Sequence, residues 1–246
     1  MMTSKEHYNL ISLLFETTSD YEKNLQTLLS LVKATDDKSL IVAPEVCLTG
    51  YDYEHFEDML AFSHRAIEAL KAASHRKIII MTLLERRGNK VYNFAKIFHN
   101  GEVVYEQAKA RLFRFGDEHK YIDEGSDDLF KILSVDGIKI AIFICFELRF
   151  KELWMKSEGA DVIAVPAWWG ESRTEHYRAL TQSLAIVNQC YVVASDSKNA
   201  ECTKMSGIIT PMGEEHRNRE SASLVVEYNK KDITLMRRYM DVGIDG

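Results

Sequence analysis

The sequence predicts a mixed α/β fold in which helices pack on β-sheets, and it favours two sheets lying face to face. Short apolar runs alternate along the chain with segments whose apolar residues recur at helical spacing. The dipeptides Asn100-Gly101 and Asp136-Gly137 each separate two apolar runs and indicate β-hairpins. With 46% hydrophobic residues, the chain can fill a large core.

The expected helices follow from apolar periodicity and capping signals. Ser19 and Glu22 form a capping-box pattern that would start the first helix, which runs through Val32. Ser172 and Glu175 would cap a long helix that reaches about Gln189. Further helices are expected over residues 57–76, 150–158 and 232–240. Strands are expected over residues 9–15, 39–43, 77–84, 91–98, 102–107, 131–135, 139–144, 161–165, 191–195, 207–210 and 222–228.

Length and composition exclude several classes of protein. The 246 residues favour a single domain over 1–246, and the formal charge of −6 argues against a nucleic-acid partner. The 4 cysteines include no C-x-x-C pair, which speaks against a disulfide scaffold or a zinc ribbon. No apolar run approaches the length of a membrane span, and no basic leader precedes the first strand. We therefore expect a cytoplasmic protein with no membrane partner.

Three reactive side chains stand at or just after the ends of predicted strands. They are Glu45 after 39–43, Lys109 after 102–107 and Cys145 after 139–144. In α/β proteins, ligands gather beyond the carboxyl ends of strands, so these side chains are candidates for one site. Taken singly, the three residues are better explained as a loop carboxylate, a solvated cation and a core thiol.

The sequence around these residues resembles the nitrilase, or carbon–nitrogen hydrolase, superfamily. The segments "IVAPEVCLTGY" (41–51), "YEQAKARLF" (105–113) and "IAIFICFELRF" (140–150) are similar to its P-E-x-x-x-x-G-Y, K-x-x-L-F and C-[YFW]-[DE]-x-R-F-P-E segments, in the same order. Tyr92-Asn93, "AVPAWWG" (164–170), "AIVNQCYVVAS" (185–195) and "PMGE" (211–214) match weaker motifs. The likeness covers nearly the whole chain.

The resemblance implies a four-layer αββα sandwich that commonly forms a homodimer, and a catalytic set of Glu45, Lys109 and Cys145. It also implies a second glutamate, for which Glu118 is the best match and Glu124 lies close enough to leave the register open. Phe146 stands where true nitrilases usually carry Trp, so the chain looks closer to the amidase branch. Two positions depart from the family pattern: Lys151 replaces a proline, and Val187 replaces a glutamate.

Amide hydrolysis assigns a role to each of these residues. Glu45 would be the general base, Cys145 the nucleophile, and Lys109 with the Phe146 backbone N–H would stabilise the oxyanion. Glu118 would position Lys109 or the substrate. Tyr51, Phe146, Trp168 and Trp169 are the candidates for the substrate pocket.

The leading hypothesis is a hydrolase of small carboxamides, such as ω-amides of dicarboxylic acids, that works through a Cys145 thioester. It needs no cofactor and no metal, since no G-x-G-x-x-G, Walker or G-x-S-x-G pattern occurs and the histidines show no ligand spacing. A hydrolase of N-carbamoyl compounds is the alternative within the same chemistry. A non-catalytic binding protein that retains the fold and a redox sensor built on Cys145 are the alternatives from other classes.

Overall fold

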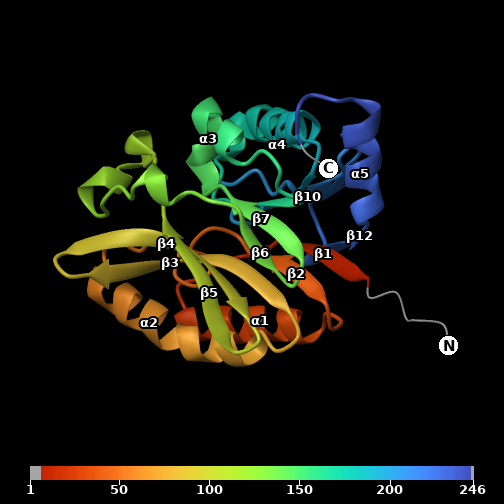
Figure 1. Ribbon diagram of the computed structural model, residues 1–246. Coiled ribbons are helices and arrows are strands. Elements are labelled where there is room, and N and C mark those ends of the chain that lie inside the picture. Colours follow the sequence, from red (N-terminus) through yellow and green to blue (C-terminus); the bar gives the residue numbers. More distant parts are fainter. Residues whose placement is uncertain (1–6, 245–246) are drawn as a thin grey trace.

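The computed structural model describes residues 7–244 and contains two six-stranded sheets (Figure 1). The first sheet runs in the order β12 (Ser223–Tyr228), β1 (Tyr8–Leu13), β2 (Ser39–Val42), β3 (Ile78–Arg87), β4 (Lys90–His99) and β5 (Glu102–Ala108). The second runs in the order β11 (Glu215–Asn218), β10 (Ser206–Ile209), β9 (Tyr191–Ser195), β8 (Val162–Pro166), β7 (Ile138–Ile142) and β6 (Leu133–Val135).

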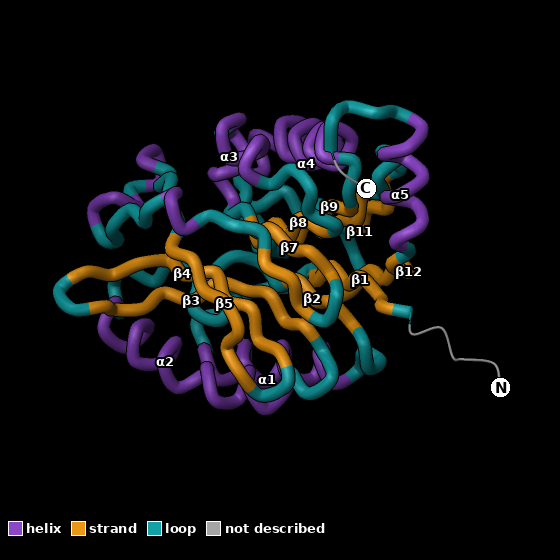
Figure 2. Tube along the Cα trace, in the orientation of Figure 1, coloured by secondary structure: helices purple, strands orange, loops and turns teal. Residues whose placement is uncertain are grey.

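Helices cover the outer face of each sheet. The helices α1 (Tyr21–Lys33) and α2 (Phe56–Ala73) lie beneath the first sheet, and α3 (Lys151–Lys156) and α4 (Thr174–Asn188) lie above the second (Figures 1 and 2). The helix α5 (Lys230–Tyr239) follows β12 beside the sheets. The expected αββα sandwich is confirmed.

The alternation of side chains along the strands explains the layers. In β2, Leu40 and Val42 belong to the core cluster that contains the second sheet, whereas Ile41 belongs to the cluster with α1 and α2. Successive side chains of a strand point to opposite faces, so a short continuous apolar run is what a strand buried on both faces requires. The first sheet is therefore covered twice, by helices on one side and by the second sheet on the other.

The hairpins form where the dipeptides indicate. Asn100 and Gly101 join β4 to β5 with φ of 49° and 86°, and Asp136 and Gly137 join β6 to β7 with φ of 50° and 82°. Two consecutive positive φ values are typical of the tight turn that matches the twist of a hairpin.

Three local expectations were wrong. The cap of α1 is Asp20, whose side chain accepts the Lys23 N–H, so the Ser19 and Glu22 box does not form. The helix α4 starts at Thr174 without a side-chain cap, because Ser172 lies inside a preceding 3₁₀ turn. Strand β11 was not expected: its sequence "EHRN" has no apolar alternation, and its pairing with β10 forms it.

The two sheets are joined by hydrogen bonds as well as by apolar packing. The Ser12 hydroxyl in β1 donates to the Ala194 carbonyl in β9, and the Gln107 amide in β5 donates to the Ile142 carbonyl in β7 at 3.1 Å. The second bond joins strand ends that precede Lys109 and Cys145. It therefore sets the spacing of the two sheets where the candidate site lies.

None of the helices within 7–244 combines the length and the apolar character that crossing a bilayer requires.

Candidate active site

Glu45, Lys109 and Cys145 are contributed by both sheets. Glu45 follows β2 and Lys109 follows β5, both in the first sheet, whereas Cys145 follows β7 in the second. The Glu45 backbone N–H donates to the carbonyl of Ala167, which follows β8 of the second sheet, at 3.2 Å. The site is thus assembled across the interface between the sheets.

Lys109 lies at the centre of a buried ion cluster. Its Nζ donates to Glu45 Oε1 and to Glu118 Oε1, each at 2.8 Å, and all three side chains are buried. Burial acts to lower the pKa of Lys109, but the carboxylates of Glu118 and Glu45 outweigh it and raise the pKa. Lys109 is therefore a permanent cation that two carboxylates share.

The two oxygens of Glu45 are in different environments. Oε1 accepts from Lys109 and from Asn93 Nδ2, both at 2.8 Å, which fixes the orientation of the carboxylate. Oε2 is buried and has no hydrogen-bond partner among residues 7–244. An oriented carboxylate with one unoccupied oxygen can accept a proton from a neighbouring group.

Glu118, and not Glu124, is the second glutamate of the cluster. Besides Lys109, its carboxylate accepts the Tyr51 hydroxyl at 3.2 Å and the Phe113 backbone N–H at 3.0 Å. Glu124 is exposed and lies 3.4 Å from Arg114. In the structure, Glu118 and not Glu124 therefore contacts Lys109.

The backbone around the nucleophile candidate is strained. Cys145 has φ +47° and starts a 3₁₀ turn over Cys145–Arg149, and Val46, next to Glu45, has φ +42°. Non-glycine residues seldom adopt this region, least of all the β-branched Val46, and such strain is concentrated at functional sites. Each strained turn places its reactive side chain at the interface between the sheets.

The Cys145 thiol is buried beside the ion cluster. Burial and the Glu45 carboxylate raise its pKa, while Lys109 and a hydrogen bond from the Trp168 backbone N–H act in the opposite direction; the pKa stays well above that of a free thiol. The resting group is therefore the protonated thiol, which needs a base before it can attack.

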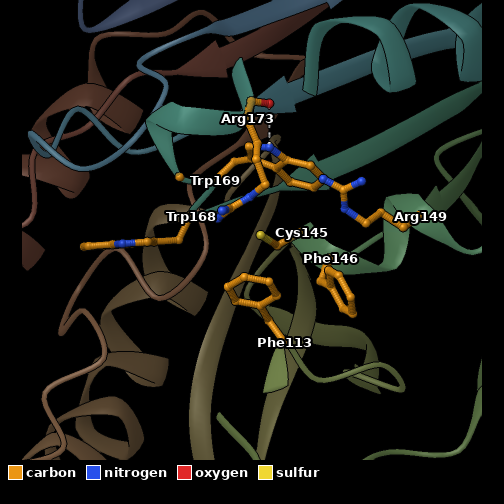
Figure 3. A pocket seen from close by; sticks show the side chains of 8 residues that line it. Phe113, Cys145, Phe146, Arg149, Trp168, Trp169 and Arg173 are labelled. Atoms are coloured by element: carbon orange, nitrogen blue, oxygen red, sulfur yellow. Dashed lines mark hydrogen bonds between the residues drawn. The ribbon is translucent and has the colours of Figure 1, made fainter. Parts of the chain in front are cut away.

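A cavity opens at the thiol (Figure 3). It is lined by Phe113, Cys145, Phe146, Arg149, Trp168, Trp169, Gly170 and Arg173. Three of the four pocket candidates, Phe146, Trp168 and Trp169, thus line the space at the thiol. Tyr51 lines an adjoining cavity together with Glu118, so it contacts the ion cluster and not the space at the thiol.

Sequence reasoning missed several residues of the site. Glu147 and Arg149 lie within the matched cysteine segment, which was the available signal for them. Asn93, which the sequence marks only as part of a weaker family motif, orients Glu45. Phe113 belongs to the matched lysine segment, whereas Arg173 precedes α4 in a stretch without any motif.

Cys145 is the one cysteine among residues 7–244 that lines this cavity. Cys47, Cys190 and Cys202 are buried and free, and burial raises the pKa of Cys47 to about 12. Within residues 7–244, no group of three or more His, Cys, Asp or Glu side chains is arranged to hold a metal ion.

The two departures from the family pattern lie outside the cluster. Lys151 is the first residue of α3, the helix position that proline favours, so it affects how the helix begins. Val187 lies on α4 and is exposed. Neither contributes to the cavity at Cys145.

Comparison with known proteins identifies the family of the chain. The model of the carbon–nitrogen hydrolase family matches residues 9–221. A 2-oxoglutaramate amidase of Bacillus subtilis (strain 168) is 31% identical over 193 residues, covering 74% of this chain and 73% of its own. A deaminated glutathione amidase of Escherichia coli O157:H7 is 30% identical over 215 residues, covering 81% of each chain.

The crystal structure of Saccharomyces cerevisiae Nit3, a member of branch 10 of the nitrilase superfamily, superposes with a TM-score of 0.84. The superposition covers 96% of this chain and 95% of Nit3 at 22% identity, so it shows a shared fold. Family model, relatives and fold agree over most of the chain. The chain therefore belongs to the carbon–nitrogen hydrolase family, and it is an enzyme that hydrolyses carbon–nitrogen bonds.

Proposed function

We propose that this enzyme hydrolyses a small carboxamide to a carboxylate and ammonia through a thioester on Cys145. The strongest support for this proposal comes from Glu45 Oε2, which has no hydrogen-bond partner among the described residues. This oxygen is buried in one cluster with the Lys109 cation and the protonated Cys145 thiol. The relatives that carry amidase names favour amides over nitriles. The cavity at Cys145 is small, which favours a short substrate.

Acylation would begin with proton transfer from the Cys145 thiol to Glu45 Oε2. The sulfur attacks the amide carbon, and the oxyanion that forms is stabilised by Lys109 Nζ and by the backbone N–H of Phe146. Glu45 then gives its proton to the departing nitrogen, the C–N bond breaks, and ammonia leaves. The product of this half-reaction is the thioester.

Deacylation would use the same groups in reverse order. Glu45 takes a proton from a water molecule, whose oxygen attacks the thioester carbon. The C–S bond breaks, Glu45 returns its proton to the sulfur, and the carboxylic acid product leaves and loses its remaining proton to solvent. Because Lys109 remains charged throughout, it serves both half-reactions as an oxyanion stabiliser and never as the base.

The remaining expectations belong to the same proposal. A homodimer would show a mass of twice 28.3 kDa by light scattering. A cytoplasmic location would appear in cell fractionation. The proposed reaction depends on neither the homodimer nor the cytoplasmic location.

The test is ammonia release from a panel of small amides, carbamoyl compounds and nitriles. Cys145→Ala should abolish the activity, and Glu45→Gln should lower kcat by a factor on the order of 10²–10⁴, as removal of a general base does. Cys190→Ala, which alters a buried cysteine away from the cavity, is the matched control.

Intact-mass spectrometry of Glu45→Gln with substrate should reveal the acyl adduct on Cys145. Activity retained in Cys145→Ala contradicts the assignment of Cys145 as the nucleophile. Full activity in Glu45→Gln contradicts the assignment of Glu45 as the general base. Release of ammonia from carbamoyl compounds alone would identify the enzyme as a hydrolase of N-carbamoyl compounds.

A further inference from the structure

Two guanidinium groups face the cavity at the thiol. Arg149 ends the turn that begins at Cys145, and Arg173 ends the 3₁₀ turn before α4; Figure 3 shows both side chains reaching toward Cys145. The two groups influence each other, because burial and then the charge of Arg173 lower the pKa of Arg149. Two like charges thus border one small cavity.

Neither guanidinium forms an ion pair within residues 7–244. Several other arginines do form ion pairs, as Arg111 does with Asp127 at 2.6 Å and Arg178 with Glu215 at 3.0 Å. Glu201 lines the adjoining cavity together with Arg173 but makes no ion pair with it. No ion pair within the described part of the chain therefore offsets the charge beside the thiol.

Aromatic side chains hold both groups in place instead. The Arg149 guanidinium lies over the Trp169 ring at 5.0 Å and donates from Nη2 to His176 Nδ1 at 3.1 Å. The Arg173 guanidinium lies over the Phe113 ring at 5.1 Å. Stacking on a ring face restrains a guanidinium while leaving most of its N–H groups free to bind a ligand.

We propose that Arg149 and Arg173 form a subsite that binds a carboxylate of the substrate. The preferred substrate is then an anionic amide, a short carboxylic acid that carries the carboxamide at its far end. The planar guanidinium fork matches a carboxylate, and an anion in this place relieves the repulsion between the two cations. The inference rests on the proposed function, since it names the substrate class of the same cavity.

The first experiment compares anionic amides with neutral isosteres. Succinamate and glutaramate are paired with 4-oxopentanamide and 5-oxohexanamide, in which a methyl ketone replaces the carboxylate. The wild-type enzyme should prefer the anionic member of each pair by at least about tenfold in kcat/KM, the value of a charge-assisted hydrogen bond. Equal turnover of both members overturns the proposal.

The second experiment removes each charge. Arg149→Met and Arg173→Met should each lower kcat/KM for the anionic amides by about 10- to 100-fold and change it less than about threefold for the neutral ones. Arg173→Lys should give an intermediate loss, since it keeps the charge and loses the fork. Arg65→Met is the matched control, because Arg65 stacks on Phe62 of the distant helix α2 at 5.3 Å. This substitution should change kcat/KM for neither the anionic nor the neutral amides.

Activity on the neutral amides reports that a variant is folded, so a loss confined to anionic amides supports the subsite. An equal loss on both classes overturns it. Binding separates this inference from the proposed function. Glutarate should bind Cys145→Ala in a calorimeter, and Arg173→Met in that background should weaken binding about tenfold or more.

If the wild-type enzyme releases ammonia from amides but glutarate binds the Cys145→Ala, Arg173→Met double variant as tightly as it binds Cys145→Ala, the subsite alone is overturned. If no amide releases ammonia while glutarate binds as expected, the proposed reaction fails and the carboxylate subsite stands.

Discussion

Glu147 accepts the backbone N–H of Ala110 at 2.7 Å, although 37 residues separate the two in the sequence. Its other oxygen accepts the Ile144 N–H at 2.7 Å. Ala110 follows Lys109 and Ile144 precedes Cys145, so one carboxylate connects the backbones beside the cation and the nucleophile. Glu147 is a positioning residue in this arrangement.

Replacing Glu147 with Gln should loosen that connection. Glutamine keeps one accepting oxygen but places an NH₂ group against the second buried N–H, which costs about 1–3 kcal/mol for the unsatisfied donor. We expect a lower Tm in thermal unfolding and a reduced kcat. Glu158→Gln, at an exposed position after α3, is the matched control. Wild-type kcat and Tm in Glu147→Gln would show that the connection has no effect.

Asn93→Ala should affect catalysis more than binding. Asn93 Nδ2 fixes Glu45 Oε1 at 2.8 Å but does not line the cavity at Cys145. Without this bond the carboxylate can rotate, and we expect kcat to fall about tenfold, the value of one hydrogen bond to a charged group, with little change in KM. Steady-state kinetics will measure kcat and KM separately. Asn89→Ala, in the exposed turn between β3 and β4, is the matched control. A rise in KM at constant kcat is the contradicting result.

Gly170→Ala should displace Arg173 without removing its charge. A Cβ at Gly170 would lie 2.6 Å from Arg173 Nη2, and the flexible guanidinium would have to move. The backbone at Gly170 has φ −63°, which alanine adopts freely, so the Tm should stay the same. We expect KM to rise several-fold for anionic amides, about the loss of one hydrogen bond, and to stay constant for neutral ones. Equal effects on both would mean that the methyl group only blocks the cavity.

The thiol of Cys145 should titrate at higher pH than an ordinary cysteine. Its pKa is raised, so the thiol stays protonated as the pH rises through the usual value of about 8.5. The ultraviolet absorbance of thiolate, taken as the difference between wild type and Cys145→Ala, should appear only above that pH. A thiolate signal at neutral pH would remove the need for Glu45 as the base of acylation.

The strands and the main site residues could be predicted because their signals are local. The apolar run before Cys145 and the dipeptide Asp136-Gly137 each specify a strand or a turn from neighbouring residues alone. The choice between Glu118 and Glu124 could not be predicted from the sequence, since it depends on which carboxylate the 3₁₀ turns direct toward Lys109. Helix starts were also misplaced, because serine and aspartate are both good caps and geometry selects between neighbours.

Arg173 illustrates a second kind of limit. Nothing in the residues around it distinguishes it from a surface arginine, and its place beside Cys145 results from the contact between a loop after β8 and the turn after β7. Strand β11 escaped prediction for a similar reason, since an edge strand of polar residues is defined by its partner.

The return of β12 to the edge of the first sheet has a consequence for biosynthesis. Strand β1 emerges from the ribosome well before β12, yet β12 is its antiparallel partner, paired from Tyr8 with Tyr228 to Leu13 with Ser223. Until that last strand is translated, β1 presents an open edge that can pair with another chain. Truncated or stalled products that end before residue 223 should therefore aggregate, and in living cells their early strands depend on chaperones for protection.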